Sequence, residues 1–273
     1  MPSNLRATYL AAPDVFTFPS SLPIPGAGRL PVNAFLIRSA QPILVDTGMA
    51  IDRGHFENAL WSLVEPEDLR WIILTHDDRD HAGNLKEVLM AAPHAKLITN
   101  GLSVARLGEE WDVPAHRVVQ VNPGRTLDLG GREISLLRPP SFDSPSTLAV
   151  YDHRSEALFS ADSLGTVIPE LAENAAEVSR TDYLDGVSMF TRANAPWTAL
   201  VDQNKWNALL DSVALLRPRL VLSAHGLTVE DRIEELLGTV RAVPTQRPWL
   251  PGEDVEAATL LAAHDTLAEV TAS

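Results

Sequence analysis

The sequence predicts an α/β protein in which two β-sheets pack face to face with helices outside. The first observation is the order of segments: short apolar runs alternate with segments of helical period, and further short runs follow. The second is length, since 273 residues can enclose a large core in one or two domains. The third is composition, because 45% hydrophobic and 21% charged residues are ordinary values for a folded chain.

In the first half we expect edge strands over 5–18 and an irregular Pro- and Gly-rich loop over 19–31. Strands are then predicted at 32–38, 42–48, 71–74, 96–99, 118–121, 125–129 and 133–138, with helices at 52–64, 83–91 and 101–110. In the second half, strands ending near Asp162 and at 219–223 enclose a long segment with helices at 172–176, 181–193 and 198–216. We expect one domain over 1–241, then a Pro-rich linker (242–252) and an acidic amphipathic helix (253–269) that covers the body or a partner subunit.

Charge and cysteine content exclude several classes of function. The 36 acidic and 22 basic residues give a net charge of −14, which argues against a surface that binds nucleic acid or anionic membrane. The chain has no cysteine, so disulfides, Cys-ligated zinc, Fe–S clusters and a thiol nucleophile are excluded. The N-terminus lacks a basic and apolar leader, and no run approaches transmembrane length, so we expect a cytoplasmic protein.

The chemistry concentrates directly after one buried strand. Trp71-Ile-Ile-Leu runs into Thr75-His76-Asp77-Asp78-Arg79-Asp80-His81, which places two His and three Asp at a strand end. A rigid strand end holds such ligands at little entropic cost, so this density favours a metal site. The alternative is a solvated acidic turn, which is the usual role of a run of charges.

His76-x-Asp78-x-Asp80-His81 resembles the His-x-His-x-Asp-His signature of the metallo-β-lactamase fold superfamily, with Asp78 where the second His is usual. Further landmarks of that family occur in its order, covering 32–226. They are Asp46-Thr-Gly48, Asp143-Ser-Pro with Asp in a ligand His position, Leu158-Phe-Ser-Ala-Asp162, and Ser223-Ala-His225-Gly226. The resemblance implies an αββα sandwich with a helical insertion over the site at about 163–216.

The resemblance also implies seven ligands for two metal ions. One ion would be held by His76, Asp78 and Asp143, the other by Asp80, His81 and His225, with Asp162 bridging. Asp80 and Asp162 are the residues we expect to take part in catalysis. Asp46 would orient a ligand His, although on the residues alone an Asx turn before Gly48 fits equally. The other His residues, at 55, 94, 116, 153 and 264, match no landmark.

Four carboxylates would offset the +4 charge of two divalent ions and leave the centre near neutral. Such an oxygen-rich, anionic set favours iron, with manganese or zinc as alternatives, and stabilises the ferric state. It also lowers the Lewis acidity of the ions, while a bridging hydroxide would remain available as a nucleophile. No Gly-x-Ser-x-Gly occurs, which disfavours a nucleophilic serine.

Two carboxylate-enriched groups of the superfamily are similar to this ligand set. One is the flavodiiron and oxygen-binding diiron proteins, in which an acidic residue takes the position of Asp78. The other is the type III thioesterases of natural-product biosynthesis, such as the diiron thioesterase of platensimycin and platencin assembly. Asp78 together with Asp143 resembles the thioesterase more, and a flavodiiron protein would carry a flavodoxin domain where only 47 residues follow Gly226.

We therefore expect a hydrolase that cleaves an acyl-CoA or acyl-carrier thioester by attack of metal-bound hydroxide. The first alternative is a diiron redox or oxygen-binding protein of flavodiiron type. The second is a binding protein that has lost one metal site.

The insertion carries residues that could line a substrate pocket. They are Tyr183, Phe190, Arg192, Trp197 and Trp206, and the alternative is that they form the apolar faces of their helices. Asp77 and Arg79 are expected only to be solvated. The expected partners are a small acyl thioester and possible further copies of the chain.

Overall fold

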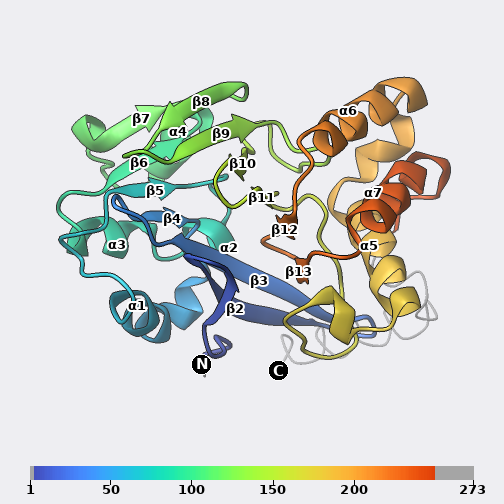
Figure 1. Cartoon of the computed structure of the whole chain (residues 1–273), viewed down its shortest axis with the longest axis horizontal. Helices are drawn as coiled ribbons and strands as arrows, with labels where there is room; N and C mark the ends of the chain where they lie inside the picture. Colours follow the sequence, from blue (N-terminus) through green and yellow to red (C-terminus); the bar gives the residue numbers. More distant parts are fainter. Residues whose placement is uncertain (1–2, 250–273) are drawn as a thin grey trace, which may run out of the picture.

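The structure is a computed structural model that describes residues 3–249, and it contains two mixed β-sheets (Figure 1). The N-terminal sheet has seven strands in sequence order, and the C-terminal sheet has six in the order β13-β12-β11-β10-β9-β8. The first comprises β1 (Tyr9–Ala12), β2 (Val15–Ile24), β3 (Gly28–Ile37), β4 (Ile43–Val45), β5 (Trp71–Ile73), β6 (Lys96–Thr99) and β7 (Val118–Gln120). The second comprises β8 (Arg125–Asp128), β9 (Glu133–Leu137), β10 (Ala149–Asp152), β11 (Ala157–Phe159), β12 (Leu220–Leu222) and β13 (Thr228–Val229).

Helices cover the outer face of each sheet. Figure 1 shows α1 (Arg53–Trp61) and α3 (Leu85–Ala91) on one side, and α5 (Arg180–Asn194), α6 (Gln203–Leu215) and α7 (Ile233–Ala242) on the other. The first side also has α2 (Arg79–Ala82) and α4 (Gly101–Glu110). Short 3-10 helices are η1 (Ala50–Asp52), η2 (Ala115–Arg117), η3 (Ala175–Glu177), η4 (Pro196–Leu200) and η5 (Val243–Thr245).

Three apolar clusters hold these four layers together. Alternation along each strand sends one set of side chains between the sheets, where Phe35 and Phe159 pack edge to face 5.2 Å apart. A second cluster joins the N-terminal sheet to its helices, and a third, which includes Tyr183 and Trp206, joins the C-terminal sheet to α5, α6 and α7. The predicted α/β sandwich is therefore confirmed.

The predicted loop over 19–31 is wrong, because β2 and β3, of ten residues each, pair as a hairpin across it. Its prolines are typical of a loop, which is why no strand was predicted there. Pro19, Pro23 and Pro31 all fall at alternate positions of the paired register, where a ladder can leave backbone N–H groups unused. The hairpin matters for the site, because the Pro31 carbonyl at its end contacts a His of the metal centre.

The other differences lie at helix ends and after His225. The helix predicted at 83–91 corresponds to α3, and a short unpredicted helix, α2, precedes it from Arg79, within the His- and Asp-rich motif itself. Neither β13 nor α7 was predicted. Of the predicted linker, residues 243–247 pack against α5 through bonds from Ser188 to Gln246 and from Arg192 to the Arg247 carbonyl. The helix expected over 253–269 lies outside the described residues.

Candidate metal centre

Four parallel-paired strands bring the functional side chains to one edge of the sandwich. Strands β4 and β5 are neighbours in one sheet, and β11 and β12 are neighbours in the other. Their carboxyl ends lead directly to Asp46, to the 75–81 segment, to Asp162 and to His225. A backbone hydrogen bond from Leu148 N to Thr75 O joins the two halves, and the 138–148 loop adds Asp143. Residues far apart in sequence therefore converge because parallel strands end on the same side.

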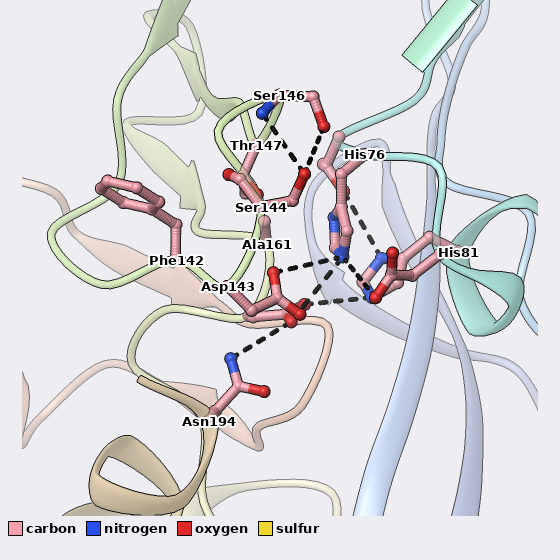
Figure 2. Close-up of polar contacts among 12 residues, drawn as sticks. His76, His81, Phe142, Asp143, Ser144, Ser146, Thr147, Ala161 and Asn194 are labelled. Atoms are coloured by element: carbon pink, nitrogen blue, oxygen red, sulfur yellow. Dashed lines mark hydrogen bonds and ion pairs between the residues drawn. The ribbon is translucent and has the colours of Figure 1, made fainter. Parts of the chain in front are cut away.

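The structure brings together all seven predicted ligands. His76 lies with Asp78 and Asp143, and Asp80 lies with His81 and His225. A third group, formed by His76, His81 and Asp162, joins the other two, and within each group the candidate ligand atoms lie within 4.8 Å of one another. Figure 2 shows Asp143 and the two imidazoles of the motif pointing toward one point.

Asp162 lies between the two groups with one oxygen toward each. Its Oδ2 is 3.7 Å from Nε2 of His76, while its Oδ1 is 3.0 Å from Nε2 of His81 and 3.4 Å from Nε2 of His225. Two donors about 2.1 Å from one ion, at roughly 90–125° to each other, lie roughly 3.0–3.7 Å apart. The spacing around Asp162 therefore suits a carboxylate that bridges two ions.

Buried polar atoms without partners support the same conclusion. His76 Nε2, His81 Nε2 and Asp162 Oδ1 are buried and have no hydrogen-bond partner among the described residues. Such atoms are costly to leave unsatisfied, at about 1–3 kcal/mol each, so three together around one point indicate an absent ligand. These residues fit a metal pair.

The remaining nitrogen of each imidazole has an acceptor. Nδ1 of His81 donates to Asp46 Oδ2 at 2.9 Å, and Nδ1 of His225 donates to the Pro31 carbonyl at 2.8 Å. Nδ1 of His76 lies 3.1 Å from Thr75 Oγ1, whose own proton goes to Asp46. With metal bound, each ring would carry its proton on Nδ1, which leaves the Nε2 lone pair for the ion.

Charge also distinguishes the ligands. Burial would raise the pKa of Asp162, but His225, His81 and His76 hold it well below its usual range. Burial would lower the pKa of His81, whereas Asp162 and Asp46 raise it well above its usual value. Burial and the neighbouring Asp162 raise the pKa of Asp143. Asp162 is thus the anionic centre, and the side chains of Asp78 and Asp143, 46% and 29% exposed, form the solvent-facing rim.

Of the five pocket residues predicted in the helical insertion, two lie beside the centre and three do not. Phe190 packs with its ring centroid 5.4 Å from that of His225, and Trp197 donates Nε1 to the Phe142 carbonyl, beside Asp143. Tyr183 and Trp206 are buried in the helical core, and Arg192 bonds within α5 and to the 243–247 segment.

Two side chains near the centre had no site role in the sequence prediction. Asn194, at the end of α5, donates to Asp162 Oδ2 at 3.4 Å, and Figure 2 shows its side chain directed toward the centre. Asp77, expected only to be solvated, accepts from Ser103 at 2.7 Å, from Ser146 at 3.3 Å and from Arg106 at 3.4 Å. It thereby joins the 75–81 motif to the loop that carries Asp143. Only its place inside the motif could have suggested this.

A fold of two sheets with a His- and Asp-rich centre at their common edge defines a class of metal-dependent proteins. The chain belongs to the metallo-β-lactamase superfamily, whose family model matches residues 27–225. Within residues 3–249, no helix is long and apolar enough to cross a lipid bilayer.

The chain is similar to flavoproteins and to flavo di-iron proteins. The chain is 35% identical over 134 residues to a diflavin flavoprotein of Thermosynechococcus vestitus, a match that covers 49% of this chain and 23% of that protein. It resembles a point variant of the flavo di-iron protein from Thermotoga maritima at a TM-score of 0.75 and 19% identity, covering 89% of this chain and 62% of the other. It resembles rubredoxin oxygen:oxidoreductase from Desulfovibrio gigas at a TM-score of 0.77 and 18% identity, covering 89% and 63%. The match to the curated flavoprotein thus spans about a quarter of that relative's length.

The predicted hydrolase acting on acyl thioesters is wrong, and with it the expected link to natural-product biosynthesis, because the matched proteins are flavoproteins and an oxidoreductase. The thioesterase was preferred to the flavodiiron group because Asp78 and Asp143 both stand where the family has His. A carboxylate-rich centre serves hydrolysis and electron transfer alike, so these replacements could not separate them. The predicted dinuclear metal cofactor is confirmed, since the ligand groups are present and a matched structure is a di-iron protein.

Proposed function

We propose that this chain is a diiron redox domain that reduces a small diatomic oxidant, with dioxygen as the probe, using electrons from a reduced flavin. The observation that carries the proposal is the seven-ligand centre joined through the two oxygens of Asp162. The likeness to flavodiiron proteins and to an oxygen oxidoreductase supports the same reaction.

The charge of the centre is compatible with electron transfer. Four carboxylates, from Asp78, Asp80, Asp143 and Asp162, balance the +4 of two ferrous ions, while the three imidazoles remain neutral. Oxidation adds positive charge, which anionic oxygen ligands stabilise better than imidazoles do. Bound iron would supply the electrons and accept new ones from the donor.

The protein residues control access and protons. The reaction O₂ + 4 H⁺ + 4 e⁻ → 2 H₂O consumes protons, and the side of the centre nearest solvent is the rim of Asp78 and Asp143. His76, His81 and Asp162 are buried, so the reacting side is the open rim rather than the strand ends.

Oxygen consumption tests the proposal. Iron-loaded chain is mixed with FMN kept reduced by NADH and a flavin reductase, and an oxygen electrode follows the rate. Reduced flavin alone yields hydrogen peroxide, from which catalase returns half of the oxygen consumed. We expect the chain to accelerate consumption and catalase to return no oxygen, because the product is water.

Two variants give the control. Asp162→Asn removes the bridging charge, and we expect at least roughly a hundredfold loss of the protein-dependent rate. Asp185→Asn, at an exposed position on α5, should leave it unchanged. A rate equal to that of flavin alone, with peroxide as product, would overturn the proposal.

A further inference from the structure

A cavity lies at the end of the sandwich away from the metal centre. Its volume is about 360 Å³, and its walls come from the β1–β2 turn, the turns before β9 and β11, and the ends of β12 and β13. Strands β11 and β12 begin beside this cavity, just after the lining residues Ser155 and Arg219. They are parallel neighbours and lead to Asp162 and His225 at their other ends. The cavity and the metal centre are thus at opposite ends of the same two strands.

The side chain of Arg132, which contributes to the cavity wall, is only 2% exposed. Its Nε donates to Asp152 Oδ1 at 3.0 Å, and its Nη2 donates to Oδ2 of the same carboxylate. This side-on pair uses one edge of the planar guanidinium, so Nη1 faces away from Asp152. Nη1 is buried and has no hydrogen-bond partner among residues 3–249.

Asp152 has no capacity left to satisfy that nitrogen. Its oxygens already accept from Arg132, from Ser155 Oγ and from the backbone N of Arg154. An unsatisfied N–H on a buried cation costs more than one on a neutral group, whose penalty is about 1–3 kcal/mol. An acceptor oxygen from outside the chain would remove this cost.

Two exposed arginines stand at the opening. Arg219 has only a 3.8 Å ion pair with Glu156, with 81% of its side chain exposed, and the guanidinium of Arg154 makes no hydrogen bond or ion pair within the described residues. The wall also contains Asp14 and Glu230, neither of which forms an ion pair with these arginines. Three arginines line one cavity, together with two carboxylates, in a chain of net charge −14. A cluster of guanidinium groups suits an anionic ligand.

We propose that this cavity binds a small molecule through a phosphate or carboxylate group. Oxygens of that group accept from Nη1 of Arg132 at the floor and from the guanidinium groups of Arg154 and Arg219 at the rim. Asp14 and Glu230 restrict the remainder of the ligand to hydroxyl or amino groups, since a second anionic group would meet them. The binding needs neither iron nor an electron donor.

Tungstate and phosphate test the site. Crystals of the full chain soaked in tungstate, a heavy oxyanion, should show one anomalous peak between Arg132, Arg154 and Arg219. Calorimetry with inorganic phosphate, in a buffer without phosphate or carboxylate, measures affinity. The pair of changes Arg154→Gln and Arg219→Gln should weaken binding by at least roughly tenfold, since each removes a charge-assisted hydrogen bond.

Arg132 itself is left unchanged, because loss of its buried pair with Asp152 would endanger folding. Arg125→Gln is the matched control: Arg125 is exposed, lies on β8 and does not line the cavity. A tungstate peak elsewhere, or phosphate affinity that is equal in the double variant and the control, would refute the proposal. Iron content and oxygen consumption do not enter these measurements, so their failure and that of the redox function are separable.

Discussion

At the scale of single residues, the centre depends on Asp46 as much as on the ligands. Asp46 accepts from the backbone N and Oγ1 of Thr75, both at 2.8 Å, and from Nδ1 of His81 at 2.9 Å. Sequence reasoning left an orienting role and an Asx turn equally open, because the partner of this carboxylate lies 35 residues away. The positions of the ligands themselves were predictable, since a spaced motif at a strand end carries its own geometry.

Asp46→Asn should therefore weaken metal binding without removing a ligand. The amide cannot accept from Thr75 and His81 together as the carboxylate does, so His81 loses its fixed tautomer and ring orientation. We expect metal affinity to fall about 10–100-fold, measured by competition with a chelator. Asp112→Asn, at an exposed position, is the control. Equal affinity in both variants would show that Asp46 only closes a turn.

The buried pair of Arg132 and Asp152 predicts how stability depends on pH. Burial would raise the pKa of Asp152, but hydrogen bonds from Arg132 and Ser155 and the Arg132 charge lower it. The group thus stabilises the fold above its unfolded pKa of about 3.9, and this contribution is lost as pH falls through the lower folded value. Asp152→Asn should cost about 3–5 kcal/mol at pH 7, measured by urea unfolding. Its difference from wild type should shrink below about pH 4, and a difference independent of pH would contradict the role of charge.

At the scale of elements, close approach between α5 and the strand-like segment 166–168 positions Phe190 and Asn194 over the centre. A Cβ added at Gly186 would lie 2.0 Å from the Val167 carbonyl oxygen and 2.6 Å from Thr166 Oγ1. The helical period of 181–193 predicted α5, because the spacing of apolar residues that marks a helix is visible in the local sequence. The contact between α5 and 166–168 could not be predicted, because the sequence around Gly186 does not indicate which segment packs against that glycine.

Two alanine substitutions separate that contact from helix propensity. Gly186→Ala should destabilise the fold by about 1–3 kcal/mol, because backbone atoms must move. Gly238→Ala, in α7, meets nothing within 4 Å and should instead stabilise by about 0.5–1 kcal/mol. Urea unfolding of the two variants measures both effects. Equal and stabilising changes would mean that α5 does not press on 166–168.

At the scale of the whole molecule, the order of landmarks between Asp46 and His225 was enough to predict the sandwich and the convergence of the ligands. The hairpin of β2 and β3 was not predictable, because its prolines mark a loop unless the pairing register is known. The reaction was not predictable either. Ligand identity fixes the charge of the centre, whereas the reaction depends on what reaches it, and the same centre accepts an electron donor or a hydrolysable substrate.

Anomalous diffraction at the iron edge, on crystals of chain grown with iron and no added zinc, tests the central claim most directly. The account predicts two peaks of similar height, one beside His76, Asp78 and Asp143 and one beside Asp80, His81 and His225, with Asp162 between them. A single peak, or peaks that persist at the zinc edge and vanish at the iron edge, would contradict it.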